Sequence, residues 1–121
     1  EMFRDFTYID DLVNATSILV DIIPGQNKMI PKIDSLSPVA PYRVVNIGNS
    51  DKVLLLDFVE EIEKILNKKA IKNYMEIQKG DVYETFADTR LLKKLTNYTF
   101  KTNIRVGLRN FVTWYKNYYR N

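Results

Sequence analysis

Helical patterns dominate this sequence, and they limit its fold more strongly than any other feature. Apolar side chains recur every three or four positions over residues 55–67, which predicts a long amphipathic helix. The same spacing predicts a helix over residues 11–23 and a C-terminal helix that begins at residue 102 or 103. A short helix is expected around Leu91, Leu92 and Leu95. In the C-terminal helix we expect one apolar stripe to pack in the core: Ile104, Leu108, Phe111, Tyr115 and Tyr118, with Trp114 beside it.

Extended segments lie between these helices. Runs rich in aromatic and β-branched residues predict strands at 3–9, 42–47 and 70–77. Residues 24–41 hold all four prolines and predict a loop, and residues 78–87 predict another. Strands that alternate with helices are typical of an α/β domain. We therefore expect an α/β fold with a short sheet, which need not be parallel, and about four helices.

Several polar residues mark the ends of these elements. Asp10 and Asp88 are suited to cap the helices that follow them. Asn67 and Asn97 are suited to the left-handed conformation that often ends a helix. These four residues give the helices defined boundaries.

Composition excludes several classes of function. The chain has 121 residues, enough for one domain, and it contains no cysteine and no histidine. Thiol nucleophiles, disulfides, the usual zinc sites and imidazole catalysis are therefore absent. The net charge is only +3 and the basic residues are scattered, so we expect no nucleic-acid partner. No apolar run approaches the roughly 20 residues of a membrane span, so we expect no membrane contact and a cytoplasmic protein.

Arg4 is the first candidate for a binding residue. It lies between aromatic residues in a segment suited to burial. A guanidinium group binds a diphosphate well because its planar fork donates two charge-assisted hydrogen bonds. An ion pair with Asp5, Asp10 or Asp11 explains the same arginine equally well. Asp10 and Asp11 themselves suit a helix cap and a first-turn dipole partner better than metal ligands.

Two glycine turns could approach a ligand. Gly48 follows the 42–47 segment, and Gly80 precedes Asp81 within the 78–87 loop. From local chemistry a structural turn is the favoured interpretation of both. The sequence holds no Gly-x-Gly-x-x-Gly, no phosphate-binding loop and no Gly-x-Ser-x-Gly, and it contains no complete catalytic pattern.

Four segments together resemble a known family. "FRDFTYIDD", "PYRVVNIGNS", "QKGDVYETFADT" and "NYTFKTNIRVGLRNFVTWYKNYY" occur in the order and spacing of the C-terminal part of extended short-chain dehydrogenases/reductases that act on nucleotide sugars. The UDP-glucuronate 4-epimerase group is the most similar, and UDP-glucose 4-epimerase is more distant. The resemblance covers nearly the whole chain. It implies that residues 1–121 are a nucleotide-sugar-binding lobe that lacks the Rossmann half, as in a C-terminal fragment.

The resemblance implies roles for particular residues. Arg4 would contact the diphosphate of the nucleotide, with Asp5 and Phe6 beside it in the substrate-binding segment. Asp81 would approach the uridine ribose. Thr85 falls where some relatives carry a tyrosine near the substrate. The expected ligand is therefore a UDP-sugar.

The resemblance also implies what lies elsewhere. In the family, NAD is bound by a glycine-rich turn in the N-terminal half, and a Tyr-x-x-x-Lys pair assists hydride transfer. Tyr115 and Lys116 are adjacent and do not match that pair. Many sugar-nucleotide epimerases have a second arginine three residues before the aspartate. Gln78 stands there, as it tends to in the UDP-glucuronate epimerase-like members. This chain alone would bind no NAD and carry no catalytic residue.

Three hypotheses follow. The first is the substrate-binding part of a nucleotide-sugar 4-epimerase, inactive alone. The second is the same lobe of a nucleotide-sugar 4,6-dehydratase or decarboxylase. The third is a small stand-alone module that binds UDP-like ligands or merely packs against a partner, without catalysis. A lobe without its Rossmann partner should expose apolar surface and tend to self-associate.

Overall fold

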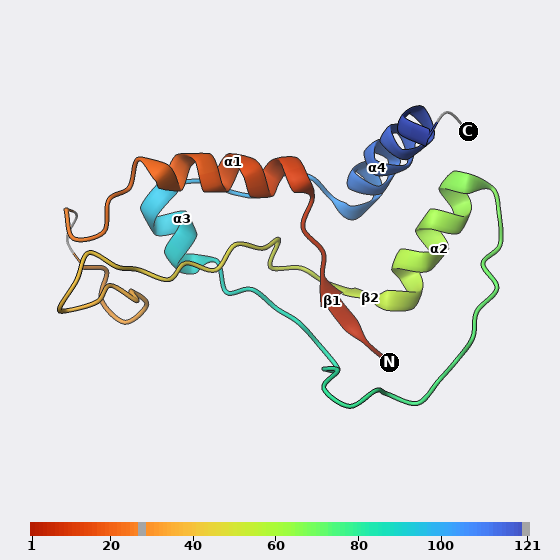
Figure 1. The fold of residues 1–121 in the computed structure, drawn as a ribbon, viewed down its shortest axis with the longest axis horizontal. Coiled ribbons are helices and arrows are strands. Elements are labelled where there is room, and N and C mark those ends of the chain that lie inside the picture. Colours follow the sequence, from red (N-terminus) through yellow and green to blue (C-terminus); the bar gives the residue numbers. More distant parts are fainter. Residues whose placement is uncertain (27–28, 120–121) are drawn as a thin grey trace.

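The computed structural model describes residues 1–26 and 29–119. The chain has an elongated outline, with both sheet strands near the middle (Figure 1). None of the helices in the described ranges is long and apolar enough to cross a membrane. Within those ranges the elements are, in order: β1 (Phe3–Asp5), α1 (Ile9–Val20), β2 (Lys52–Leu54), α2 (Leu55–Leu66), α3 (Arg90–Thr96) and α4 (Ile104–Tyr119).

The sheet is small and antiparallel, and it separates two pairs of helices. β1 pairs with β2 so that Arg4 lies opposite Val53. Helix α2 follows β2 without a connecting residue. Helix α1 packs on α3, and α2 packs on α4. Figure 1 shows the first pair on one side of the sheet and the second pair on the other. The predicted small α/β lobe with about four helices is confirmed.

The core lies within these helix pairs and is small. Helix α3 contributes its two adjacent leucines, and α4 contributes one turn of its inner face. Gly107 allows α4 to approach the start of α1, since a β-carbon there would lie 3.2 Å from the Tyr8 ring. The buried apolar residues of the described chain are Ala15, Leu91, Leu92, Leu108 and Val112.

The helix ends differ in part from the predictions. Asn67 and Asn97 end α2 and α3 in the left-handed conformation, with φ of 51° and 55°, as predicted. The predicted cap at Asp10 is wrong, because the extended Tyr8 is the N-cap and Asp10 lies inside the first turn of α1. Thr89, and not Asp88, is the N-cap of α3. The Asp88 carboxylate still accepts a hydrogen bond from the first backbone N–H of the helix.

The strand predictions were mostly wrong. The predicted strand 3–9 is correct only for β1, because β2 is three residues long and offers no further partner. The short β2 itself was missed. Segment 42–47 is not a strand, because its first half pairs with a neighbouring loop: the Ser37 N–H donates to the Tyr42 carbonyl at 2.8 Å. Segment 70–77 is not a strand either, and its apolar residues are exposed, with Ile71 fully so.

Loop 24–41 is confirmed over its described residues, and residues 27 and 28 lie outside them. A buried ion pair closes this loop onto the next segment. The Arg43 guanidinium donates to both carboxylate oxygens of Asp34, at 2.8 and 3.1 Å. Both side chains are at most 2% exposed. The ion pair therefore fixes part of this loop, although the loop has no regular structure.

The aromatic stripe of α4 is largely not in the core. Leu108 is buried as predicted, but Phe111, Trp114, Tyr115 and Tyr118 are between 46% and 67% exposed. The spacing correctly indicated one face of a helix. It did not show that little of that face is covered within the described residues, where α2 is the helix that packs against α4.

Candidate functional site

Strand β1 has a neighbour on each edge. β2 lies along one edge, and the 78–87 loop lies along the other. The backbone N–H of Phe3 donates to the Tyr83 carbonyl at 2.9 Å, and the Thr85 N–H donates to the Phe3 carbonyl at 3.1 Å. The Asp5 N–H donates to the Thr85 hydroxyl oxygen at 3.1 Å. These bonds fix a distant loop against the strand that carries Arg4.

The Arg4 guanidinium is held by this loop. Its Nη1 donates to the carbonyls of Phe3 and Tyr83, at 2.9 and 3.3 Å. Its Nη2 lies 3.3 Å from Oδ1 of Asp81. The Arg4 side chain is 20% exposed, and the Asp81 side chain is 46% exposed. The arginine is therefore oriented by the backbone, and its carboxylate partner faces solvent.

A tight turn presents Asp81. The Asp81 N–H donates to the Gln78 carbonyl at 3.0 Å. Gly80 has a φ of +93°, a conformation that residues with a β-carbon rarely adopt. The turn expected at this glycine exists, and it directs Asp81 toward Arg4.

Asp5 organises the backbone on the other side of β1. Its Oδ1 accepts the Asn49 N–H at 3.0 Å, and its Oδ2 accepts the N–H groups of Ser50 and Ala87, at 3.0 and 2.9 Å. Gly48 completes this arrangement, since a β-carbon there would lie 2.4 Å from the Ala87 β-carbon and 3.1 Å from Asp5 Oδ2. The close approach explains the glycine, and it fits the structural interpretation of that turn.

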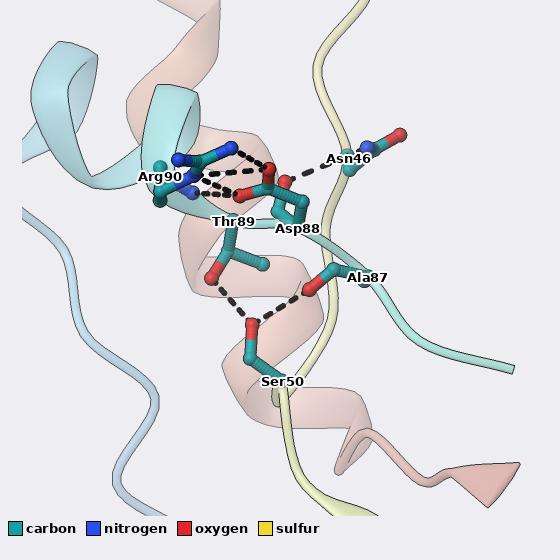
Figure 2. Close-up of polar contacts among 6 residues, drawn as sticks. All are labelled: Asn46, Ser50, Ala87, Asp88, Thr89 and Arg90. Carbon is teal, nitrogen blue, oxygen red and sulfur yellow. Dashed lines mark hydrogen bonds and ion pairs between the residues drawn. The ribbon is translucent and has the colours of Figure 1, made fainter. Parts of the chain in front are cut away.

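A second polar network joins the same segments to the start of α3 (Figure 2). The Ser50 hydroxyl bonds to the Ala87 carbonyl at 2.7 Å and shares a hydrogen bond with the Thr89 hydroxyl, also at 2.7 Å. The Asn46 amide donates to the Asp88 carbonyl at 3.4 Å. The middle of the 78–87 loop is thus attached to β1, and its C-terminal end is attached to the Gly48 turn.

A small cavity of about 280 Å³ lies beside these contacts. Asp5, Thr85 and Gly48 are among the residues that line it. On the β2 side, Lys52 pairs with Glu84 of the loop, with N–O distances of 3.0 Å. The loop therefore carries two ion pairs to neighbouring strands, one from Arg4 and one from Lys52.

Phe6 lies in a different part of the molecule. Its ring stacks on Phe58 of α2, with centroids 3.9 Å apart and 15° between the planes. Both rings line an apolar groove of about 920 Å³ between the β1–α1 connection, α2 and α4. Ile62, Phe111 and Trp114 also line it. Of the aromatic residues that α4 exposes, Phe111 and Trp114 line this groove, and Tyr115, Tyr118 and Tyr119 do not.

The structure brings most of the predicted site residues together. Arg4, Asp5, Asp81 and Thr85 meet where β1 contacts the 78–87 loop. Phe6 is separate, in the groove. The ion pair that Arg4 makes is with Asp81, 77 positions away, and not with a neighbouring aspartate. The carboxylate of Asp5 is occupied by three backbone donors, which favours a positioning role for it.

Sequence reasoning missed the buried role of Asp11. Its carboxylate accepts the Tyr98 hydroxyl at 2.8 Å and the Thr102 N–H at 3.0 Å. Burial by itself would raise the pKa of Asp11, but these hydrogen bonds outweigh it and hold the pKa below its ordinary value. Asp11 precedes Ala15 by one helical turn, so its place on the buried face was a usable signal.

Glu63 is a second buried carboxylate that the sequence did not reveal. Hydrogen bonds from Lys69 and Lys72, both at 2.7 Å, and from the Ala70 N–H at 3.0 Å, lower its pKa to about 2. These contacts fold the 69–72 segment back onto the end of α2. They explain why the start of the predicted strand 70–77 is not free to pair as a strand.

No family model matches the chain. Protein CapI from Staphylococcus aureus is 46% identical over 121 residues, which are 98% of this chain and 36% of that protein. A probable UDP-glucuronate 4-epimerase from Rhizobium meliloti (strain 1021) is 43% identical over 122 residues, again 98% of this chain and 36% of the relative. The chain thus spans about a third of the length of these curated relatives.

Solved structures agree with these relatives. The UDP-glucuronic acid 4-epimerase from Bacillus cereus, in complex with UDP-glucuronic acid and NAD, matches with a TM-score of 0.75 and 28% identity. The match covers 98% of this chain and 33% of that one. MoeE5, in complex with UDP-glucose and NAD, has a TM-score of 0.78 at 23% identity and shares the fold.

Proposed function

We propose that this chain is the part of a UDP-glucuronate 4-epimerase that binds the nucleotide sugar. The chain is homologous to about one third of the length of these enzymes, which are NAD-dependent extended short-chain dehydrogenases/reductases. The reaction of the whole enzyme, inversion at C4 of a UDP-sugar, is part of the proposal. In this proposal residues 1–121 form one substrate-binding lobe. The lobe binds and orients the substrate, and it carries none of the catalytic groups.

The orientation of Arg4 is the observation that supports this function most. Two backbone carbonyls accept from its Nη1, so the side chain keeps its direction without a ligand. A pre-oriented guanidinium is suited to bind a diphosphate, because little conformational freedom is lost on binding. The neighbouring Asp81 can accept hydrogen bonds from sugar hydroxyls. The pair therefore offers one group for the phosphates and one for a ribose.

Asp5 and Thr85 help to fix the backbone on either side of the Arg4 contacts. The bonds of Asp5 to the Gly48 turn and to Ala87, with the Asp5 N–H bond to Thr85, attach the ligand-facing loop to β1. In the proposal Asp5 positions its neighbour Arg4, and Thr85 lines the small cavity beside Asp5. Phe6 contributes indirectly, by packing the strand onto α2.

NAD does not fit the residues of this chain. The pyrophosphate of NAD is usually bound by a glycine-rich turn at the start of a helix. The four glycines here are isolated, and none belongs to a Gly-x-Gly-x-x-Gly sequence. Homologous structures hold NAD over a chain about three times as long. In the proposal, NAD chemistry comes from the part of the enzyme outside this chain.

The apolar groove fits the same proposal. A groove of about 920 Å³ lined by Phe58, Ile62, Phe111 and Trp114 is a large exposed apolar surface for a domain of this size. In a protein with the length of the relatives, we propose that part of the remaining polypeptide covers it. Without that cover, the groove favours self-association.

The relatives favour epimerisation over the alternatives. Proteins named UDP-glucuronate 4-epimerase reach 43% identity to this chain. A dTDP-glucose 4,6-dehydratase from Bacillus anthracis shares the fold at 21% identity, with a TM-score of 0.65. The proposal therefore names a UDP-sugar as the ligand and a 4-epimerase as the enzyme.

UDP binding by the 121-residue chain tests the proposal. We expect Arg4→Ala to weaken UDP binding by about 2 kcal/mol, measured by isothermal titration calorimetry, because a charge-assisted contact to the diphosphate is lost. Arg105→Ala is the matched control. Arg105 pairs with Glu61 on the other side of the sheet, and its side chain is 70% exposed.

The UDP affinities of the two variants and of the parent chain decide whether Arg4 binds the diphosphate. Circular dichroism spectra should show that both variants keep the helical content of the parent chain. If UDP binds equally well to Arg4→Ala and to the parent, Arg4 is not the diphosphate ligand. If UDP does not bind the parent chain at all, the binding role of this lobe is refuted.

A further inference from the structure

We propose that Asp81 is a specificity-determining residue that screens Arg4 from anions without hydroxyl groups. The inference rests on the proposed function, in which Arg4 binds the phosphates of the ligand. It concerns which phosphate compounds the site accepts. A ligand that offers hydroxyl donors next to its phosphates enters, and a bare polyphosphate is disfavoured.

The screening follows from the geometry of the pair. Asp81 Oδ1 lies 3.3 Å from Nη2 of Arg4, so the guanidinium already has an anionic partner before any ligand arrives. The other terminal nitrogen is occupied by two backbone carbonyls. A phosphate that binds Nη2 of Arg4 must therefore share that nitrogen with the Asp81 carboxylate or displace it. The Arg4 side chain is only 20% exposed, so little of it is open to an approaching anion.

Asp81 is held where it can act in this way. The Gly80 turn and the bond from the Asp81 N–H to Gln78 fix the backbone at this position. Its side chain is nearly half exposed, so a ligand reaches it from solvent. The carboxylate is therefore anchored at its base and accessible at its oxygens.

The sign of the effect depends on the ligand. Two like unit charges about 4 Å apart in water repel enough to change a binding constant about fivefold. Pyrophosphate experiences this repulsion from Asp81 and gains nothing in return. A nucleoside diphosphate can donate its ribose hydroxyls to the same carboxylate, and hydrogen bonds to a charged acceptor are among the stronger ones. Asp81 thus lowers the affinity for one class and supports the other.

Titrations with pyrophosphate and UDP test the proposal on the 121-residue chain. We expect Asp81→Asn to bind pyrophosphate about fivefold more tightly than the parent, and to bind UDP no more tightly. In the parent, 2′,3′-dideoxyuridine diphosphate should bind several-fold more weakly than UDP, and Asp81→Asn should remove most of that difference. Glu84→Gln is the matched control, because Glu84 pairs with Lys52 and its loss also removes one negative charge.

The readouts separate this inference from the proposed function. If Asp81→Asn leaves pyrophosphate binding unchanged, or if Glu84→Gln tightens it equally, Asp81 does not screen Arg4 and the inference is overturned. If Asp81→Asn tightens pyrophosphate binding but UDP binds no better than pyrophosphate to the parent, the screening stands and the nucleotide-binding function fails.

Discussion

Replacing Asp5 by asparagine should destabilise the lobe strongly, although the two side chains have almost the same shape. The Asp5 carboxylate accepts three backbone N–H groups, from Asn49, Ser50 and Ala87. Asparagine keeps one acceptor oxygen and turns the other into an NH₂ donor. If the amide oxygen of the asparagine stays opposite the Asn49 N–H, the N–H groups of Ser50 and Ala87 lose their acceptor and face the NH₂ donor instead.

The expected loss can be worked from these contacts. A hydrogen bond to a charged group contributes roughly 1.5–3 kcal/mol, and an unsatisfied buried donor costs about 1–3 kcal/mol. We therefore expect Asp5→Asn to lower the free energy of unfolding by about 3 kcal/mol. The whole free energy of unfolding of a domain of this size is about 5–15 kcal/mol. With a urea m value of about 1.5 kcal/mol per molar, the midpoint should fall by about 2 M.

Urea unfolding followed by circular dichroism at pH 7 measures this loss. Asp51→Asn is the control, since Asp51 is an exposed aspartate in the same turn region. It changes the net charge equally, and we expect its effect to stay within about 0.5 kcal/mol. Equal midpoints for Asp5→Asn and Asp51→Asn would refute the argument that the Asp5 carboxylate organises the backbone.

Two further predictions concern other contacts of the fold. The pKa of Glu63 lies near 2, below its unfolded value of 4.5, so its contacts stabilise the protein above about pH 4.5 and lose that effect as the pH falls toward 2. Glu63→Gln should therefore flatten the decline of the urea midpoint between pH 4.5 and pH 3, whereas Glu60→Gln, on an exposed position, should leave the decline unchanged. Gly48→Ala should lower the free energy of unfolding by about 1–3 kcal/mol, because the new β-carbon would lie 2.4 Å from that of Ala87. Thermal unfolding of the double variant with Ala87→Gly should recover part of the loss, and no recovery would mean that a different contact explains the glycine.

Local features of the fold could be predicted from the sequence, because their causes lie within a few residues. The α2 helix follows from its apolar spacing, and its end follows from the left-handed preference of Asn67. The Gly80 turn has the same character. Such features depend on backbone propensities and on neighbouring side chains, and both can be read along the chain.

Strands and burial could not be predicted in the same way. Segments 42–47 and 70–77 have strand-type residues, but a strand also needs a partner, and other contacts hold Tyr42 and the start of segment 70–77. The 69–72 region is bound to Glu63, and Tyr42 bonds to Ser37. Similarly, the spacing of Phe111 and its neighbours defines a face of α4, while exposure depends on what covers that face.

The sequence by itself determined the helices, the left-handed ends of α2 and α3, and the resemblance that singled out Arg4 and Asp81. Only the tertiary structure decided that these two residues form one ion pair across 77 positions, and that Asp5 faces three backbone donors while Phe6 lies in the groove. The physical reason is that a side chain's type limits what it can bind, whereas its partner depends on where the chain returns. In this lobe, the 78–87 loop returns to the edge of β1, and this return places Asp81 beside Arg4.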